Sequence, residues 1–499
     1  MPYTLLASLL IPALGFPFVY LAGKKSSKAA AVALIAATLV VLGLVLTTVP
    51  SVLNGPNNRY EESYTWIPVV LNSQFTLFVD GISLSMVIMT MVIILAATLF
   101  SINYMEGKKN LATYYALMSL LTVGLVGVFI ASNLLLFYFF WELMIIPAYF
   151  ILGNWGYKDS YKAAFKFFIY THAGAVFIIL GIGGIFMLTG TLDMFQAASA
   201  LMNANAELVK WVLIAVTAGF AVKMAIVPLH SWLPDAYSEA PAPMSALLSG
   251  VLTSAGAYAV IRISLGTVLP ALITNGAAFA TDFLYGMSIL GVISAFFGSF
   301  MALRETDIKR VMAYSSISHM GYIMFGFSLF PIDIALNGTV LQIITHGISK
   351  GLFFLTAGVL MNALATRNMR DMGGLASKMP STAVSSMTAA LSLAGTPPFA
   401  CFISEVLIFV GAFQMITMTG SAFYMATTGL MLVATVLSLG YSLRFISNVF
   451  FGPPKTEEPK KFNVPKYMQA AMVLLAVLVI LVGIYPTFFL NLIGSVHFI

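Results

Sequence analysis

The sequence predicts an all-α, polytopic membrane protein with about fourteen transmembrane helices. Of its 499 residues, 60% are hydrophobic and only 8% are charged, whereas roughly a quarter of a soluble domain is charged. So few charges cannot cover a water-facing surface, and most of them lie in short segments between long apolar runs. Most of the surface therefore faces lipid. The net charge of +6 reflects the basic segments and requires no nucleic-acid partner.

Each apolar run is close to or above the roughly 20 residues that cross a bilayer. The runs are expected to be helices, because unpaired strand edges are too costly in lipid. The first run is long enough to span the membrane and has no clear cleavage site after it, so we do not expect a cleavable signal. The predicted spans cover residues 4–22, 29–51, 76–103, 111–130, 133–152, 163–190, 208–228, 241–264, 280–303, 310–329, 333–362, 383–418, 421–449 and 468–492.

Lysine and arginine residues alternate between the two sides of this predicted bundle. One side carries Lys24, Lys25, Lys28, Lys108, Lys109, Lys158, Lys162, Lys166, Arg304, Lys309, Arg310, Arg367, Arg370, Lys378, Lys455, Lys460, Lys461 and Lys466. The other side has Arg59, Lys210 and Arg262 and little else. By the positive-inside rule, the basic side faces the cytoplasm in the cell membrane. Both termini then lie outside, which requires an even number of spans.

Two of the predicted spans are broken by proline. The seventh meets Pro228 and a polar stretch from Leu229 to Pro243, and the twelfth contains the sequence GTPP at 395–398. Proline removes a helix donor, and broken helices are tolerated in membranes where they are buried in protein or line a polar cavity. Paired breaks indicate two inverted repeats around a transport site. The predicted divisions are residues 1–110 with helices 1–3, 111–266 with the first five-helix repeat, 267–450 with the second, and 451–499 with a cytoplasmic loop and helix 14.

Six ionisable residues remain at membrane depth once the loop charges are set aside. They are Glu142 in helix 5, Lys223 in helix 7, His319 in helix 10, His346 and Lys350 on one face of helix 11, and Glu405 in helix 12. Asp80 opens helix 3 and is expected nearer an interface. Any one of the six could be a structural hydrogen-bonding group. Together they carry a large desolvation cost, which favours a chain of groups that bind and release protons.

We expect no cofactor and no metal on this chain. His172 in helix 6 is expected only to form a hydrogen bond. The spacing of His230, Asp235 and Glu239 suggests metal ligands, but the prolines between them break the helical register. Cys401 is the single cysteine. A cysteine cluster, a Gly-rich phosphate loop and a dinucleotide-binding fingerprint are all missing from the sequence.

Several segments carry a resemblance to a known family over nearly the whole length. They are FVDGISLSM (78–86), LLFYFFWELMIIPAYFILG (135–153), AVKMAIVPLHSWLPDAYSEAPAPMSALLSGVL (221–252), RETDIKRVMAYSSISHMGYI (304–323) and GTPPFACFISE (395–405). The chain resembles the antiporter-like subunits of respiratory complex I and their relatives in multisubunit cation/proton antiporters and membrane-bound hydrogenases. A Glu at position 405 resembles the M-type subunit.

The resemblance implies roles for matching residues. Glu142 and Lys223 would be the paired acid and base of a first half-channel. His319 and His346 would form a central relay, and Glu405 would end the second half-channel. Asp307 and Lys309 would lie in a loop on the cytoplasmic side.

The sequence departs from the family pattern in helix 8. Relatives usually carry a lysine there, where this chain has Ser254, and serine cannot hold a protonic charge. Our hypothesis is that Lys350 takes over, so that His319, His346 and Lys350 form the central group.

Three functions stay open from the sequence. The first is a proton-translocating, cofactor-free subunit of a complex I-type oxidoreductase and translocase, driven through its neighbours. The second is a Na⁺/H⁺ exchange subunit of a multisubunit antiporter or membrane-bound hydrogenase complex. The third is a structural subunit whose charges only hold helices together. The expected partners are neighbouring antiporter-like and small membrane subunits, the lipid bilayer, and peripheral redox subunits indirectly, with no nucleic acid.

Overall fold

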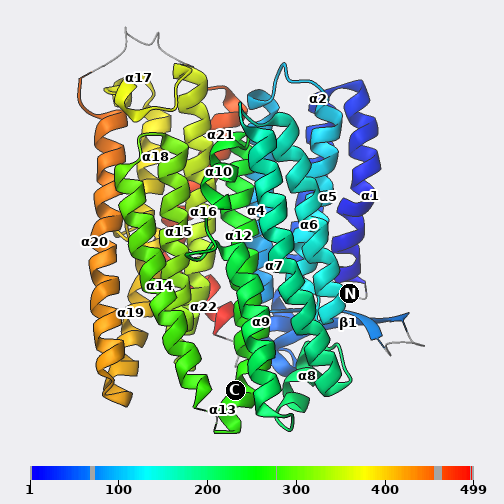
Figure 1. Ribbon diagram of the computed structural model, residues 1–499. Coiled ribbons are helices and arrows are strands. Elements are labelled where there is room, and N and C mark those ends of the chain that lie inside the picture. The colour runs from blue at the N-terminus through cyan, green and yellow to red at the C-terminus, as the bar shows by residue number, and fades with distance from the viewer. Residues whose placement is uncertain (1–2, 68–72, 277, 454–462, 495, 497–499) are drawn as a thin grey trace.

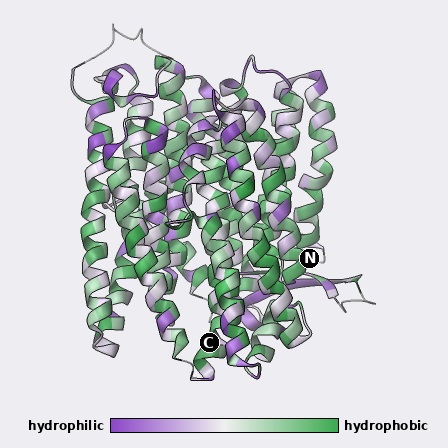
Figure 2. Ribbon diagram, in the orientation of Figure 1, coloured by the Kyte–Doolittle hydropathy of each residue, from purple (hydrophilic) through white to green (hydrophobic). Residues whose placement is uncertain are grey.

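The computed structural model describes residues 3–67, 73–276, 278–453, 463–494 and 496. Long helices stand side by side in one bundle (Figure 1). Apolar residues dominate its middle, and hydrophilic residues collect towards its two ends (Figure 2). This is the distribution that a bilayer imposes on a spanning bundle.

The N-terminal part contains a β-hairpin that the sequence analysis missed. Its elements are α1 (Thr4–Lys25), α2 (Ser27–Leu46), α3 (Val49–Asn54), η1 (Pro56–Asn58), β1 (Arg59–Ile67), β2 (Ser73–Asp80) and α4 (Gly81–Tyr104). The third helix was predicted from residue 76, but residues 73–80 form a strand paired antiparallel with β1. Asp80 begins the helix by accepting hydrogen bonds from the backbone N–H groups of Ile82 and Ser83 at 3.1 and 2.9 Å. An acceptor at this position caps a helix N-terminus.

The first set of five spans contains the first predicted break. Its elements are α5 (Leu111–Ile130), α6 (Leu134–Trp155), α7 (Ser160–Thr189), α8 (Met194–Leu201), α9 (Ala206–Met224), α10 (Trp232–Glu239), α11 (Ala242–Leu247), the π-helical turn η2 (Leu248–Leu252), α12 (Thr253–Ala259), the π-helical turn η3 (Val260–Val268) and α13 (Leu269–Thr274). At the break, Ala225 adopts a left-handed φ of 54°. The Trp232 indole then donates to the Val222 carbonyl at 2.9 Å, which satisfies a carbonyl near the end of α9.

The second set of five spans contains the other break. Its elements are α14 (Phe279–Arg304), α15 (Ile308–Phe327), α16 (Asp333–Leu364), η4 (Met369–Asp371), α17 (Leu375–Lys378), α18 (Pro380–Leu393), α19 (Ala400–Thr419) and α20 (Ala422–Phe450), followed by α21 (Lys466–Ile484) and α22 (Thr487–Ile493). The chain passes from α9 up to α10 but from α18 down to α19 (Figure 1). The two broken spans therefore run in opposite directions, as inverted repeats require.

The predicted order of spans is confirmed. Within the described residues, twelve helices are long and apolar enough to cross a membrane. The other two predicted spans correspond to α9 and α15, which are more polar. The shorter α9 carries Glu207, Lys210 and Lys223, and α15 begins with two basic residues and contains three serines. These are the polar groups expected of helices that line a transport route.

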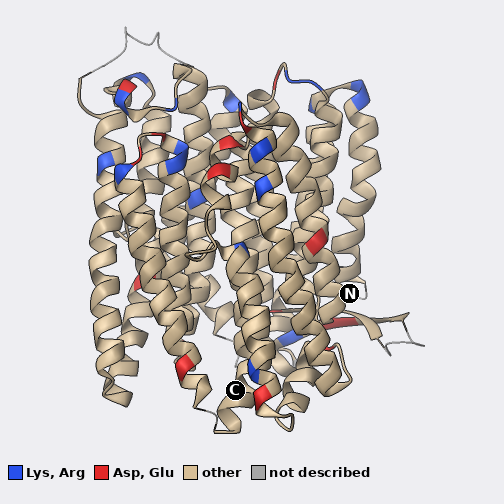
Figure 3. Cartoon of the chain, in the orientation of Figure 1, with Lys and Arg blue, Asp and Glu red and all other residues tan. Residues whose placement is uncertain are grey.

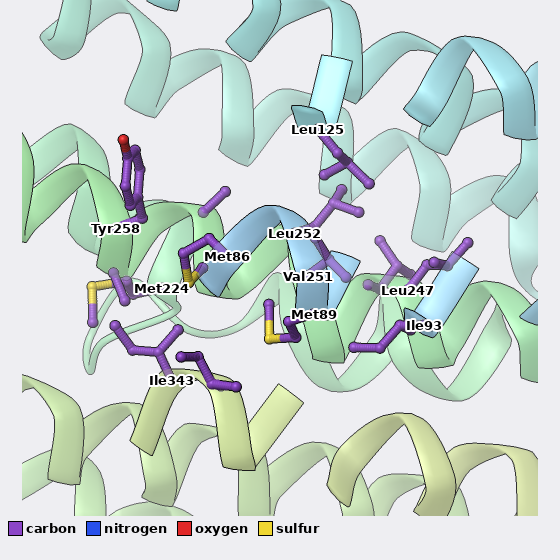
Figure 4. Close-up of a cluster of buried hydrophobic side chains, with 14 of the residues drawn as sticks. Met86, Met89, Ile93, Leu125, Met224, Leu247, Val251, Leu252, Tyr258 and Ile343 are labelled. Atoms are coloured by element: carbon purple, nitrogen blue, oxygen red, sulfur yellow. The ribbon is translucent and has the colours of Figure 1, made fainter. Parts of the chain in front are cut away.

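The centre of the bundle is formed by α4, α16 and the continuous helix from α11 to α13. Gly250 and Gly347 mark a close crossing, because a Cβ added at Gly347 would lie 2.6 Å from the Gly250 carbonyl oxygen. An apolar cluster surrounds this crossing, with Met89 and Ile93 from α4 and Val251 from η2 (Figure 4). The two sets of spans therefore meet across a tightly packed apolar junction.

Basic side chains gather at one end of the bundle, opposite the end towards which both chain termini lie (Figure 3). Lys455, Lys460 and Lys461 of the predicted basic side lie outside the described residues. Two sequence assignments need correction. Arg262, counted with the basic residues of the far side, is buried in η3 and pairs with Asp80. Lys309, predicted in a loop, lies in the first turn of α15, where Asp307 caps the helix by accepting from its backbone N–H at 2.8 Å.

Candidate functional site

Glu142 lies on α6 at the outer surface of this chain. Its carboxylate Oε2 is 3.1 Å from Nε2 of His172 on α7, and the two side chains are 23% and 38% exposed. Tyr138, one turn earlier on α6, interacts with the same carboxylate. The direct partner of Glu142 is thus His172, to which the sequence analysis gave only a hydrogen-bonding role. Its significance depends on a contact between two helices, which the sequence does not display.

Lys223 lies behind this pair, near the end of α9. Its side chain is buried, and its ammonium group is 5.6 Å from the Trp141 ring centre and 5.4 Å from that of Phe167. It has no hydrogen-bond partner among the described residues. Glu142 lies close enough for their charges to interact. The predicted acid and base therefore share one cluster, in which the base contacts aromatic faces and the acid contacts a histidine.

Lys350 and the two histidines form a second, fully buried group. The ammonium of Lys350 on α16 donates to the Met312 carbonyl at 2.9 Å and to the Ser315 hydroxyl, both on α15. The rings of His319 on α15 and His346 on α16 have centres 5.4 Å apart. Neither ring nitrogen of His346 has a hydrogen-bond partner among the described residues. The helices α15 and α16 thus bring all three predicted central residues together.

Gln342 connects this central group to Glu405 on α19. The Gln342 amide nitrogen is 3.4 Å from Nδ1 of His319, and the Gln342 side chain also lies near the Glu405 carboxylate. Ser404, next to Glu405, donates to the Gln342 amide oxygen. Sequence reasoning missed Gln342 because an uncharged polar residue in a helix does not stand out as a charge does.

Glu405 lies beside the second break and faces outwards. Its carboxylate is packed against Gly395, whose positive φ of 64° and missing side chain leave room for it. A pocket of about 310 Å³ opens here between the break and α20, with Thr396 and Val436 in its lining. Glu405 is only 5% exposed, yet its Oε1 has no hydrogen-bond partner among the described residues. The two outermost carboxylates, Glu142 and Glu405, therefore each approach the surface of the chain.

Ser254 gives no polar connection between the two groups. Its hydroxyl donates to the Gly250 carbonyl of its own helix at 2.9 Å. Gly256, half a turn further on, packs against Lys223, and Leu252 and Ile343 belong to the apolar cluster of Figure 4. Among the described residues, Lys350 makes no hydrogen bond to Ser254. It contacts α15 instead.

A network of ion pairs covers the basic end of the site. Asp235 on α10 pairs with Lys166 on α7 at 2.8 Å and with Arg310 on α15 at 3.2 Å. Glu239 pairs with Arg367 at 3.1 Å. Asp235 and Glu239, two of the three residues whose spacing suggested metal ligands, thus have cationic partners. Within the described part of the chain, no three His, Cys, Asp or Glu side chains gather as a metal site requires.

Tyr157, between α6 and α7, packs against this network. Its ring centre lies 4.9 Å from the Lys309 ammonium and 5.1 Å from the Arg367 guanidinium. Burial raises the pKa of the Tyr157 hydroxyl above its usual range, so the ring stays neutral at physiological pH. It contacts these cations through its aromatic face rather than as an anion.

Comparison with known proteins identifies relatives of the whole bundle. Residues 131–431 match the family described as NADH:quinone oxidoreductase/Mrp antiporter, TM. Residues 66–115 match the family described as NADH-ubiquinone oxidoreductase (complex I), chain 5 N-terminus.

Two curated relatives show similarity over most of their length. The NADH-quinone oxidoreductase subunit M of Pseudomonas aeruginosa is 37% identical over 422 residues, which covers 82% of this chain and 79% of the relative. The F(420)H(2) dehydrogenase subunit M of Methanosarcina mazei is 32% identical over 436 residues, which covers 86% and 84%.

Two solved structures share the fold. A chain of respiratory complex I from Thermus thermophilus has a TM-score of 0.85 and 23% identity, and the match covers 99% of this chain and 98% of that one. A chain of the Mrp complex from Dietzia sp. has a TM-score of 0.84 and 22% identity, with 99% and 97% covered.

Proposed function

We propose that six ionisable residues at membrane depth carry the proton through this chain. The chain belongs to the NADH:quinone oxidoreductase/Mrp antiporter family, as an M-type, proton-pumping antiporter-like subunit. The observation that supports the proposal most directly is the arrangement of the six residues in two clusters. One contains Glu142 and Lys223, and the other runs from Lys350 and the histidines through Gln342 to Glu405. Ionisable groups at membrane depth are costly to retain without a use.

Charge coupling within each cluster gives the proposed mechanism. A protonated Lys223 is stabilised by the Glu142 carboxylate, and it loses that stabilisation when Glu142 is neutralised or drawn away. In the second cluster, a water beside Gln342 takes a proton from His319 and gives one to Glu405, and the Gln342 amide orients that water. A change in a neighbouring subunit drives the cycle by shifting the charge on Glu142, which then shifts the protonation of Lys223.

This chain is proposed to work as a cofactor-free subunit of an oxidoreductase complex. Two of its relatives above 30% identity are the subunits M of NADH-quinone oxidoreductase and of F(420)H(2) dehydrogenase. Electron transfer is assigned to peripheral partner subunits that this chain contacts only indirectly. Its direct partners are neighbouring antiporter-like and small membrane subunits. Sodium/proton exchange in an antiporter complex is the second candidate. It is favoured by the similarity in fold to a chain of the Mrp complex, whose sequence is 22% identical.

We assign the basic end of the bundle to the cytoplasmic side of the cell membrane. Lysine and arginine side chains gather there (Figure 3), and such residues are retained on the cytoplasmic side during insertion. Both chain termini then face the outside.

The test is proton pumping by the intact complex in vesicles, with electron transfer measured in parallel. In Lys223→Ala, pumping is expected to fall by roughly tenfold or more, while the complex still assembles. Lys210→Ala is the matched control, because Lys210 lies on the same helix and forms an ion pair with the nearby Glu207 at 2.6 Å. Normal pumping in an assembled Lys223→Ala complex would contradict the proposed function.

A further inference from the structure

We propose that His172 is a further proton-binding group of the first cluster, sharing one proton with Glu142 and loading it from the outer face of the chain. The inference rests on the proposed function, because it adds an entry step to the same proton route. It is carried by the geometry of the His172 ring, whose two nitrogens have different partners.

The first nitrogen fixes the tautomer of the ring. Nδ1 of His172 is 3.1 Å from the backbone carbonyl oxygen of Phe168. A carbonyl oxygen only accepts hydrogen bonds, so Nδ1 must carry a hydrogen and donate it. A neutral ring with hydrogen on Nδ1 has a bare lone pair on Nε2.

The contact between the second nitrogen, Nε2, and Glu142 then requires a proton between the two atoms. Nε2 lies 3.1 Å from Oε2 of Glu142, and a bare nitrogen facing an ionised oxygen at that distance would be repelled. The contact is attractive in only two states. Either an imidazolium faces a carboxylate, or a neutral ring accepts from a carboxylic acid. Both states hold one proton between Nε2 and Oε2, so the pair stores one transferable proton.

The pair lies at the outer face of the chain, where a neighbouring membrane subunit is proposed to supply the proton. His172 is the more exposed member at 38%, and Phe139, Ile146 and Ile169 make the surface around it apolar. The other titratable groups facing the pair are Tyr138 on the same helix as Glu142 and Lys223 on α9. The Phe168 ring stacks on the imidazole with centres 3.9 Å apart, which holds the ring in place.

The proposed step conserves protons. The Nε2–H bond of His172 breaks and an O–H bond forms on Glu142, so both groups become neutral. Lys223 then loses its counter-charge and passes one proton inwards. A proton handed over by a neighbouring membrane subunit restores Nε2–H, and Glu142 passes its own proton to Lys223. The cluster then returns to its starting state, and one proton enters at His172 for each that leaves Lys223.

Two substitutions at position 172 separate proton transfer from a merely structural contact. Arginine keeps a donor to Glu142 but stays charged and cannot release its proton. Glutamine keeps a polar side chain that cannot ionise. If His172 only positions Glu142, His172→Arg should pump better than His172→Gln. If it transfers a proton, His172→Arg should be the more damaging variant, with pumping per electron pair lower by roughly tenfold or more.

The measurement is protons pumped per electron pair by the reconstituted complex between about pH 5 and 8, where histidine titrates. His172→Gln is expected to pump several-fold more slowly and to lose one ionisation from its pH profile. Lys210→Ala is again the control, because Lys210 pairs with Glu207 away from this cluster, and it should keep the wild-type profile. If His172→Arg does not assemble, the profile of His172→Gln decides alone.

Glu142→Gln distinguishes failure of the inference from failure of the proposed function. Normal pumping by Glu142→Gln would overturn both. If Glu142→Gln stops pumping while His172→Gln and His172→Arg pump as the wild type at every pH, the proposed function stands and the role of His172 is wrong.

Discussion

Lys350 is the residue whose role depends most on its immediate contacts. Its ammonium is fully buried and held by the Met312 carbonyl and the Ser315 hydroxyl, and no carboxylate of the described residues is bonded to it. A buried ammonium without a counter-charge gives up its proton more readily than an exposed one. Lys350→Ala is therefore expected to abolish pumping while the complex remains assembled. Pumping at the wild-type rate would show that this lysine is structural.

Gln342 offers a second test in the same cluster. Gln342→Leu keeps nearly the same size but removes the side chain that contacts His319 and Glu405. We expect the complex to assemble with its electron-transfer subunits as the wild type does. Proton pumping, measured in vesicles, should be several-fold slower. Thr339→Val is a suitable control one turn away on α16, since the Thr339 hydroxyl bonds only to the Ala335 carbonyl of its own helix. Equal rates in the two variants would exclude Gln342 from the route.

The sequence revealed some of these residues and concealed others for a physical reason. A charge inside an apolar span is costly and conspicuous, so Glu142, Lys223, Lys350 and Glu405 could be picked out from the sequence. Gln342 is uncharged, and its importance arises from contacts on other helices. Residue type therefore predicted the charged members, and only the packing of helices identified the groups between them.

At the scale of the elements, the crossing of η2 and α16 sets the distance between the two halves. A Cβ at Gly347 would lie 2.6 Å from both the Gly250 carbonyl oxygen and the Met89 sulfur. Gly347→Ala should therefore force the helices apart and destabilise the chain by about 1–3 kcal/mol, seen as lower thermal stability of the purified complex.

Gly351→Ala is the control for this prediction. It lies one turn later on the same helix, and a Cβ there would meet its nearest neighbour at 3.5 Å, an ordinary contact. A similar loss of stability in both variants would mean that helix propensity or general crowding, rather than the crossing, is responsible.

The missed hairpin shows where element prediction failed. Residues 73–80 alternate between the two faces of a strand but run directly into the apolar helix α4. A sequence read for long apolar runs merges the two. The strand is possible because its backbone groups pair with β1, so the rule against unpaired strands in lipid is not violated.

The Asp80–Arg262 pair joins this hairpin to η3. Both side chains are at least nine-tenths buried and paired with each other. Removing one partner leaves a buried charge unpaired, which costs about 3–5 kcal/mol. Asp80→Ala should therefore lower the thermal stability of the complex more than Glu61→Ala, since Glu61 is an exposed partner of Arg59 on the neighbouring strand. Equal effects would indicate that the buried pair contributes little.

At the scale of the whole molecule, the number and order of spans could be predicted because lipid imposes the same length and polarity on every span. The meeting of α11–α13 with α16 could not, because it depends on small residues far apart in sequence. The orientation of the bundle is a property of this scale too, since it follows from the sum of many loop charges rather than from any one of them.

Orientation can be tested with single cysteines, because Cys401 is the one native cysteine and is buried. Glu106 lies in the exposed loop after α4, and Asn203 lies in the exposed loop before α9, at the other end of the bundle. In a Cys401→Ser background, Asn203→Cys should react with a membrane-impermeant thiol reagent in right-side-out vesicles, and Glu106→Cys only in inverted ones. The reverse pattern would place the basic end outside. The proton route would then run in the opposite sense, with Lys223 nearer the cytoplasmic side than the Asp235 network.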